Sequence, residues 1–389
     1  MRPTVLSLFN NVPQRAGGNE SFARELSIQL GEQGWDSVLC FPEVPDNEIR
    51  GWFTSAGAVV ETCPEAFASG PSCIAPLHRL LVRYRPRILH LHFMGFLDPH
   101  AWIGRLHGVR QIFFTDQGSR PEGHGGRRYP SWKRRAAWLI SLPVTKCIPV
   151  SDYVLDCCLE QGILAADRVE RIYNGVDRLR VVEQDPAAGA QFRQRLGIPR
   201  DRIVVMQMCW MIPEKGVSDL LAAAKLVCAA CSGVHFVLAG DGPERSRYLE
   251  QAAALDLEEH VTFTGLVRDP FAEGAFAAAD IVCLVSRWEE AFGWVIAEAM
   301  AHGRPVIGTD AGAIPSLVRH GETGLIVSRG RPDEIARAIL ELVRDSEARI
   351  RMGAAARADA AERFDLRNNV RRLLEIYGIG VQTPVSSAL

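Results

Sequence analysis

The stretch Glu290-Ala-Phe-Gly-Trp-Val-Ile-Ala-Glu298 places two carboxylates eight residues apart, where a predicted strand passes through a loop into a predicted helix. A helix N-terminus has unpaired N–H groups and a partial positive charge, which suit a phosphate group. Carboxylates at the same place would repel phosphate, so their expected partners are hydroxyl groups, which donate hydrogen bonds to carboxylate oxygens. A ligand with a phosphate in its middle and hydroxyls at both ends is a nucleotide sugar.

Further motifs lie on both sides of this stretch. They are Gly17-Gly18-Asn-Glu, Tyr173-Asn-Gly-Val-Asp177, Pro213-Glu-Lys-Gly216, Leu238-Ala-Gly-Asp-Gly-Pro243, Phe263-Thr-Gly-Leu-Val267, Ala299-Met-Ala-His-Gly-Arg-Pro-Val-Ile-Gly-Thr-Asp310 and Gly321-Glu-Thr-Gly-Leu-Ile-Val327. In order and spacing they resemble the retaining GT-B glycosyltransferases of family 4, the Glu-x7-Glu type of the glycosyl transferases group 1. The resemblance extends over roughly the whole chain.

Length and charge limit the class of protein. A chain of 389 residues is too long for one ordinary core, so two domains are expected. The 44 basic and 46 acidic residues give a net charge of −2, which argues against a general nucleic-acid binder. The longest apolar run, Ala136 to Val150, is interrupted by Pro143 and Lys146, and the N-terminus lacks a signal-peptide pattern. We therefore expect a cytoplasmic protein.

Apolar strands alternate with helical patterns in both halves of the chain, which predicts α/β architecture with parallel sheets covered on both faces. The predicted strands are Thr4–Phe9, Ser37–Phe41, Ala58–Glu61, Ile88–His92, Gln111–Thr115, Cys147–Val150 and Val169–Tyr173, then Ile203–Cys209, His235–Ala239, Val261–Phe263, Ile281–Val285, Pro305–Gly308 and Leu325–Val327.

The resemblance implies the GT-B fold, in which two Rossmann-like doubly wound domains face each other across a cleft. We expect an acceptor-binding domain at residues 1–178, a nucleotide-sugar-binding domain at residues 179–362, and a C-terminal segment at residues 363–389 whose helix Leu366–Tyr377 crosses back to the first domain. The polar segment Asp177–Pro199 is the predicted linker. Ligands of such sheets bind beyond the carboxyl ends of the strands, so the site should lie in the cleft.

By this resemblance the catalytic residues are Glu290, which should face the donor sugar, and Lys215, whose point charge can stabilise the leaving pyrophosphate. The loop Ala291, Phe292 and Gly293 should offer backbone N–H groups to the donor, and Glu298 should accept hydrogen bonds from the ribose hydroxyls. A solvated loop lysine is the alternative for Lys215. For Glu298 the alternative is an ion pair with Arg304 or another cation.

Two further loops are expected at the donor. Gly17 and Gly18 precede the first helix, and a loop without β-carbons lets a diphosphate or an acceptor approach the backbone; a plain tight turn is the alternative. In the resembled family the loop Leu266, Val267 and Arg268 holds the base through backbone groups, and stacking of Arg268 on the base is a further expectation.

The chain departs from the family pattern at two positions. Trp210 stands where relatives usually carry an arginine, five residues before Lys215, so that one of two phosphate-binding cations is missing unless another arginine substitutes. Gln117, a predicted donor-binding residue, stands where relatives often have histidine, and glutamine cannot act as an acid or base. The alternative function is therefore a nucleotide-sugar-binding protein or pseudo-glycosyltransferase with altered or lost transfer.

The segment from Arg120 to Arg135 is unusually basic, with Arg120, Arg127, Arg128, Lys133, Arg134 and Arg135 against Glu122, so 6 − 1 = +5. Three interpretations compete: a solvated loop, a clamp for an anionic acceptor, and a peripheral contact to anionic lipid at the inner membrane face. Arg120, Arg127 and Arg128, together with His92, are the predicted acceptor-binding residues. His90 and His92 share one strand face, but a metal site needs more ligands than these.

The predicted function is therefore the retaining transfer of a sugar from a nucleotide-sugar donor to a hydroxyl of a small-molecule, glycan or lipid-linked acceptor. UDP is preferred over GDP from family frequency alone. Neither a cofactor nor a metal is expected. A phosphorylase of the same architecture is a third option, and it would require pyridoxal phosphate.

Overall fold

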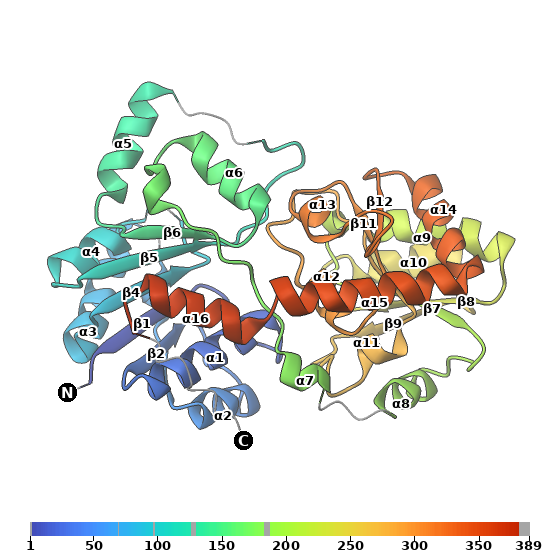
Figure 1. Ribbon diagram of the computed structural model, residues 1–389, viewed down its shortest axis with the longest axis horizontal. Coiled ribbons are helices and arrows are strands. Elements are labelled where there is room, and N and C mark those ends of the chain that lie inside the picture. Colours follow the sequence, from blue (N-terminus) through green and yellow to red (C-terminus); the bar gives the residue numbers. More distant parts are fainter. Residues whose placement is uncertain (1, 69, 96–97, 126–129, 183–186, 381–389) are drawn as a thin grey trace, which may run out of the picture.

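A computed structural model describes residues 2–68, 70–95, 98–125, 130–182 and 187–380. Its strands form two six-stranded sheets, and helices cover both faces of each sheet (Figure 1). The first sheet has the order β3-β2-β1-β4-β5-β6 and the second the order β12-β11-β10-β7-β8-β9, and neighbouring strands are parallel throughout. Counted from its own first strand, each sheet has the same doubly wound order, as expected for two Rossmann-like domains.

The first domain contains the first sheet. Its strands are β1 (Thr4–Phe9), β2 (Asp36–Phe41), β3 (Ala58–Thr62), β4 (Ile88–His92), β5 (Gln111–Asp116) and β6 (Lys146–Pro149). Its helices are α1 (Gly18–Glu32), α2 (Asn47–Ser55), α3 (Ile74–Tyr84), α4 (His100–Leu106), α5 (Ser131–Ser141) and α6 (Asp152–Gln161). All six residues of β1 are buried, because a central parallel strand is covered by helices on both faces.

The second domain contains the second sheet. Its strands are β7 (Ile203–Met208), β8 (Val234–Ala239), β9 (Val261–Gly265), β10 (Ile281–Leu284), β11 (Val306–Thr309) and β12 (Gly324–Val327). The helices from the connection onward are α7 (Arg178–Val182), α8 (Ala188–Arg195), α9 (Val217–Ala230), α10 (Arg245–Ala254), α11 (Ala275–Ala278), α12 (Trp294–Ala301), α13 (Ile314–Leu317), α14 (Pro332–Arg344), α15 (Ser346–Arg363) and α16 (Leu366–Ile376).

The last helix, α16, lies against the first domain (Figure 1). Its residues Val370 and Leu373 share a buried apolar cluster with Leu26 and Leu30 of α1. The segment that returns to the first domain contacts the segment that leaves it. The N–H of Val176 donates to the carbonyl of Phe364 at 2.7 Å, and the N–H of Leu366 donates to the carbonyl of Val176 at 3.2 Å. The predicted domain boundaries at residues 178 and 362 remain predictions, but the chain does pass twice between the sheets at this place.

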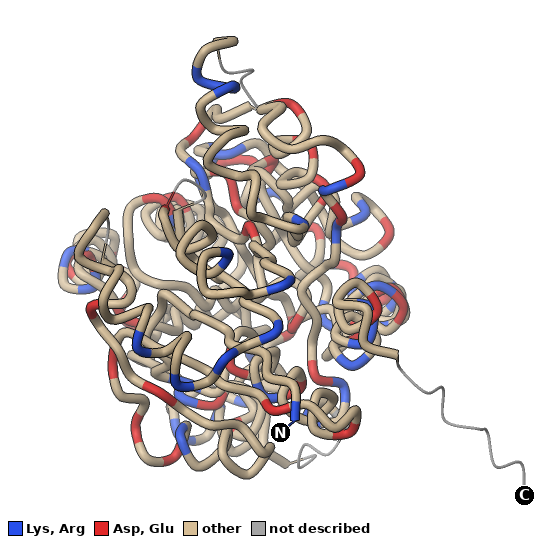
Figure 2. Tube along the Cα trace, turned by 90° about the vertical axis from the view of Figure 1, so that its left-hand side faces the viewer, with Lys and Arg blue, Asp and Glu red and all other residues tan. Residues whose placement is uncertain are grey.

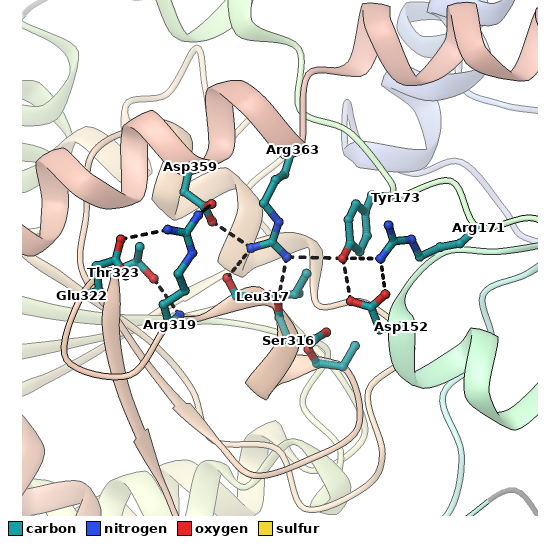
Figure 3. A network of polar contacts seen from close by, with 11 residues as sticks. Asp152, Arg171, Tyr173, Ser316, Leu317, Arg319, Glu322, Thr323, Asp359 and Arg363 are labelled. Atoms are coloured by element: carbon teal, nitrogen blue, oxygen red, sulfur yellow. Dashed lines mark hydrogen bonds and ion pairs between the residues drawn. The ribbon is translucent and has the colours of Figure 1, made fainter.

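Arg363, at the end of α15, joins polar groups of both domains beside this crossing (Figure 3). Its guanidinium donates to the carbonyl of Ser316 at 2.6 Å and to the hydroxyl of Tyr173 at 3.5 Å. The Tyr173 hydroxyl in turn donates to Asp152 at 2.6 Å. The crossing is therefore held by side chains as well as by backbone.

One sequence-based expectation needs correction. The predicted strand Val169–Tyr173 runs beside β6 with two backbone hydrogen bonds, from Glu170 and Ile172, but forms only an isolated bridge rather than a strand. The predicted linker Asp177–Pro199 contains α8, which packs against α11. A β-carbon on Gly189 of α8 would lie 2.8 Å from the carbonyl carbon of Ala277, so α8 is part of the second domain's packing.

The helix α5 projects at the top of Figures 1 and 2, while residues of both charges are interspersed along the remaining trace (Figure 2). The side chains of α5 are mostly exposed, and they include Trp132 and Trp138. Among the helices that the structure describes, none has the length and apolar character needed to cross a membrane.

Candidate active site

Glu290 lies in the loop between β10 and α12 and is only 4% exposed. Its Oε1 accepts hydrogen bonds from the Lys215 ammonium at 2.5 Å, from the Trp288 indole at 2.9 Å and from the Ser286 hydroxyl. Its Oε2 accepts from Ser119 of the first domain at 3.4 Å. Burial raises the pKa of Glu290, but the charge of Lys215 and these donors outweigh it, so that its pKa lies below the ordinary value. The two predicted catalytic residues thus form one buried ion pair.

Backbone geometry places Lys215 at this carboxylate. A short 3-10 turn (Pro213–Lys215) ends at Gly216, which adopts a left-handed φ of 67°. A β-carbon on Gly216 would lie 2.0 Å from the carbonyl oxygen of Val285, so only glycine allows this close approach to the end of β10. The Lys215 ammonium also lies 4.9 Å from the centroid of the Trp288 ring. Lys215 is therefore held on two sides and is not the solvated lysine of the alternative interpretation.

The start of α12 has the free donors that a phosphate requires. Gly293 caps the helix with a left-handed φ of 90°, and the ring of Phe292 is buried against Phe364. Within the described chain, the N–H groups of Phe292 and Gly293 donate no hydrogen bond, whereas the N–H of Ala291 donates to the Ser119 hydroxyl at 3.4 Å. The first turn of a helix adds further N–H groups without an intrahelical partner.

Glu298 lies inside α12 and is 3% exposed. Burial raises the pKa of Glu298, and the positive charges of Arg15 and Arg180 offset only part of that rise. Arg304 does not pair with Glu298, because its guanidinium donates to the carbonyl of Ala277 at 3.0 Å. Within the described residues, the Glu298 carboxylate accepts no hydrogen bond. It therefore remains available to hydroxyl donors of a ligand.

The glycine-rich loop of the first domain contacts the second domain directly. The N–H of Ala16 donates to the carbonyl of Arg268 at 3.0 Å. A β-carbon on Gly18 would lie 2.0 Å from the ring of Trp294, at the first turn of α12. The absence of a side chain at Gly18 is thus required by protein packing, whereas the sequence suggested room for a ligand. A β-carbon on Gly17 would lie 3.1 Å from Nε of Arg15.

The predicted base-binding loop follows β9. Leu266 is exposed and Val267 is buried. The guanidinium of Arg268 lies 3.7 Å from the Asp46 carboxylate, which caps α2 of the first domain. Arg268 therefore reaches across to the first domain, and its expected stacking on a base would require it to leave Asp46.

The predicted acceptor residues lie in different places. Arg120 pairs with Asp116 at 2.7 Å, while Arg127 and Arg128 lie outside the described residues. His92 is buried, with its ring stacked on Phe9 at a centroid distance of 4.1 Å. His92 and Gln117 line a cavity of about 20 Å³, which has room for about one water molecule rather than a sugar.

A larger cavity of about 540 Å³ lies between the domains and reaches Trp288 beside Glu290. It is lined by Ser119, Arg120, Pro121, Glu122, Pro213, Glu214, Arg287 and Trp288. Both arginines have partners: Arg120 pairs with Asp116, and Arg287 donates to both oxygens of Asp219 at 2.6 and 2.7 Å. Glu122 and Glu214 form no ion pair with any other residue that the structure describes. The cavity wall is thus aromatic on one side and carries unneutralised carboxylates.

The sequence did not reveal the role of Glu289, the neighbour of Glu290. Its Oε1 accepts from the N–H of Gly123 at 2.9 Å and from Arg329 at 2.7 Å, and its Oε2 accepts from the N–H of Gly312 at 2.5 Å. Because Gly123 belongs to the first domain, this carboxylate closes one edge of the cleft. The only signal in the sequence was the second glutamate beside Glu290, and its partners are too distant in the chain to be found by spacing.

No group of three or more His, Cys, Asp or Glu side chains suited to a metal ion occurs in the described parts of the chain.

Comparison with known proteins adds to this geometry. A model described as Glycosyltransferase Family 4 matches residues 16–180, and one described as Glycosyl transferases group 1 matches residues 190–359. A GDP-mannose-dependent alpha-(1-6)-phosphatidylinositol monomannoside mannosyltransferase of Mycobacterium tuberculosis is 33% identical over 376 residues, 91% of this chain and 92% of that protein. The chain belongs to the family 4 glycosyltransferases.

Other relatives of this family 4 glycosyltransferase match over shorter lengths. The alpha-D-kanosaminyltransferase of Streptomyces kanamyceticus is 32% identical over 62% of this chain and 63% of its own length. The N-acetyl-alpha-D-glucosaminyl L-malate synthase of Bacillus anthracis is 32% identical over 54% of this chain and 53% of its own length. This chain therefore spans less than two thirds of these two relatives.

Solved structures agree on the GT-B fold of this glycosyltransferase. The Anabaena protein HepE, in complex with UDP and glucose, has a TM-score of 0.78 at 21% identity, with 97% of this chain and all 100% of that chain covered. A glycosyltransferase of Rickettsia africae has a TM-score of 0.81 at 19% identity, with 97% and 98% covered. The predicted fold class is thereby confirmed, and the predicted family is confirmed by the two family models and the mannosyltransferase relative.

Proposed function

We propose that this glycosyltransferase moves a sugar from a nucleotide-sugar donor to a hydroxyl acceptor in the cleft, with retention of configuration. The proposal rests on the ion pair of Glu290 and Lys215 next to the N-terminus of α12. At this N-terminus the N–H groups of Phe292 and Gly293 donate no hydrogen bond within the described chain. An anion suits the N–H groups, and hydroxyls suit the carboxylates Glu290 and Glu298.

In this scheme the chain binds and orients the donor. The diphosphate lies on the N–H groups at the start of α12, and Lys215 meets the phosphate that leaves. A sugar hydroxyl donates to Glu290 and takes over part of its hydrogen bonding from Lys215, which frees the ammonium for the phosphate. The leaving phosphate helps to take the acceptor's proton on the same face, so the protein contributes positioning and charge stabilisation. Metal independence is part of this proposal, since Lys215 and backbone donors supply the positive charge.

The proposal also extends to the nucleotide of the donor. We propose UDP rather than GDP, because UDP donors are more frequent in the family. The mannosyltransferase relative carries GDP-mannose in its name, so both nucleotides must be tried.

The acceptor is proposed to enter the cavity of about 540 Å³ beside Glu290. The Trp288 face suits the apolar face of a ring, and Glu122 and Glu214 suit hydroxyl or ammonium donors. Because Arg120 and Arg287 are already paired with carboxylates, the cavity favours a neutral or cationic polyol over an anionic acceptor. One relative is named a 2-deoxystreptamine N-acetyl-D-glucosaminyltransferase, which agrees with an amine-bearing polyol.

We also propose a peripheral membrane contact through the basic segment 120–135 together with α5, which begins within that segment. This helix exposes 67% of Trp132 and 49% of Trp138, and Leu139 and the following Leu142 are also exposed. It carries Lys133, Arg134 and Arg135 and no acidic residue. Tryptophan at the headgroup level together with basic side chains suits an anionic bilayer surface, as proposed for the inner face of the cytoplasmic membrane.

A nucleotide-sugar-binding protein without transfer is the second candidate, favoured by Trp210 and Gln117. Incubation of the purified chain with UDP-glucose or GDP-mannose separates the two. A transferase slowly releases UDP or GDP even without acceptor, and with an acceptor it gives a product whose anomeric proton coupling in NMR matches that of the α-linked donor. A rise in melting temperature without nucleotide release would instead favour the binding protein, and an inverted product would contradict retention.

A further inference from the structure

The proposed donor brings more negative charge than the described site neutralises. A diphosphate gains negative charge as it leaves, and Lys215 is already paired with Glu290. Trp210, at the position where the family resemblance leads us to expect an arginine, is 60% exposed and uncharged. From the second domain, the leaving diphosphate therefore meets backbone N–H groups and the Lys215 ammonium, which is shared with Glu290. The leaving group itself carries two or three negative charges.

Arg15 of the first domain lies close enough to add the missing charge. It belongs to the loop between β1 and α1 and is half-buried. Its Nη1 lies 3.7 Å from Sδ of Met208, the last residue of β7, so its side chain reaches the carboxyl end of the second sheet. A thioether is a weak acceptor, which leaves the guanidinium's strong donors available.

The charge of Arg15 is not neutralised by an ion pair to any residue that the structure describes. The positive charge of Arg15 acts on Glu20 of α1 and on Glu298 of α12, one on each side of the cleft. It favours the charged form of both carboxylates. The contact of Gly18 with Trp294 holds the same loop at the first turn of α12. Arg15 thus lies among the end of β7, the start of α12 and the proposed ribose-binding carboxylate.

We propose that Arg15 binds the diphosphate of the donor and replaces the arginine missing at position 210. This inference rests on the proposed nucleotide-sugar function. Because Arg15 belongs to the first domain while Lys215 and the start of α12 belong to the second, the diphosphate would also draw the two domains together. A guanidinium can meet two phosphate oxygens at once, which a lysine ammonium cannot do in the same geometry.

The test compares the affinity of the full chain for UDP and for GDP by isothermal titration calorimetry. The variants are Arg15→Ala, Arg15→Lys, Trp210→Arg and the double variant Arg15→Ala/Trp210→Arg. The matched control is Arg351→Ala, an exposed arginine on α15. Melting temperatures without ligand show that each variant is folded.

For the nucleotide that the unchanged protein binds, Arg15→Ala should weaken binding by about tenfold or more, the range of a charged hydrogen bond, and Arg15→Lys should recover only part of the loss. The double variant should regain affinity, since an arginine at position 210 restores the charge from the second domain. A purely structural role of Arg15 would not be rescued from another loop. The Arg351→Ala control should bind as the unchanged protein does.

Equal binding by Arg15→Ala and the unchanged protein would overturn the role of Arg15, as would a loss that Trp210→Arg leaves unrepaired. Failure of the unchanged protein to bind either nucleotide would instead overturn the proposed donor. The two failures are therefore distinguishable.

Discussion

The backbones of Arg120 and Glu289 exchange two hydrogen bonds of 2.9 Å each, although one residue follows β5 in the first domain and the other follows β10 in the second. The bridge lies directly beside Glu290. The loop after β5 is therefore part of the same wall as the proposed catalytic carboxylate, and the Ser119 hydroxyl of this loop donates to Glu290 at 3.4 Å.

Variants of Glu290 and Lys215 should change the stability of the protein and its turnover in different ways. Lys215→Ala leaves a buried carboxylate without its cation and should cost about 3 kcal/mol of unfolding free energy. The double variant Glu290→Gln/Lys215→Met removes both charges and should regain stability. Both should lower turnover by about 100-fold or more, because the leaving phosphate loses its cation. Chemical denaturation and nucleotide release measure the two effects.

Glu250→Gln, an exposed glutamate on α10, is the control for this pair. Near-normal turnover in the double variant would refute the catalytic assignment.

Glu289→Ala should open the cleft. The substitution leaves Arg329 and the N–H groups of Gly123 and Gly312 without their acceptor, and of these only Gly123 belongs to the first domain. We expect a larger radius of gyration in small-angle X-ray scattering and a higher KM for the acceptor. Glu250→Ala should change neither quantity. An unchanged scattering profile with Glu289→Ala would show that the Arg120–Glu289 backbone bridge suffices alone.

The pH dependence of stability should depend on Glu20, which faces Arg15 and Glu298. Burial raises the pKa of Glu20 from 4.5 to about 7. A raised carboxyl pKa stabilises the fold fully below pH 4.5, and this contribution is lost as pH rises through about 7. Glu20→Gln should therefore be more stable than the unchanged protein at pH 8, by about 3 kcal/mol at most, and similar at pH 4.5.

Urea denaturation at both pH values measures this difference. Parallel stability curves for Glu20→Gln and the unchanged protein would contradict the prediction.

We expect α5 to be the part of the protein that binds anionic membranes. In vesicle flotation, the unchanged protein should bind vesicles of phosphatidylglycerol and phosphatidylcholine and should not bind pure phosphatidylcholine. The variant Trp132→Ser/Trp138→Ser should lose most of this binding, because both indoles are exposed on α5. Trp102→Ser, on α4, is the matched control for an exposed tryptophan. Equal flotation of all three proteins would show that α5 is not the contact.

Local patterns predicted the regular elements well. The strand Thr4–Phe9 was predicted with the bounds that β1 has, because its apolar run is buried on both faces. The apolar run of β4 was equally clear. The segment Val169–Tyr173 has the same character, but it lies at the edge of the sheet and forms too few backbone bonds to be a strand.

The residues of the candidate site could be predicted only where they belong to one sequence motif. Glu290 and Glu298 share one stretch, and Lys215 followed from the family resemblance. The roles of Arg15 and Glu289 depend on distances between domains, which no local pattern encodes. Gly18 was recognised as special, yet its neighbour Trp294 lies far away in the sequence, so the reason for the glycine appears only in the folded chain.

The two segments that connect the domains are held together at Val176 and Leu366, which has a consequence for domain motion. A β-carbon on Gly175 would lie 2.4 Å from Cα of Leu366, so the two chain segments touch and cannot slide past each other. Because both segments that connect the domains are joined to each other here, we expect any opening of the cleft to be a rotation about this contact rather than a sliding of one domain along the other. A pair of spectroscopic labels at the far rims of the two domains would then report the opening as a change in one distance.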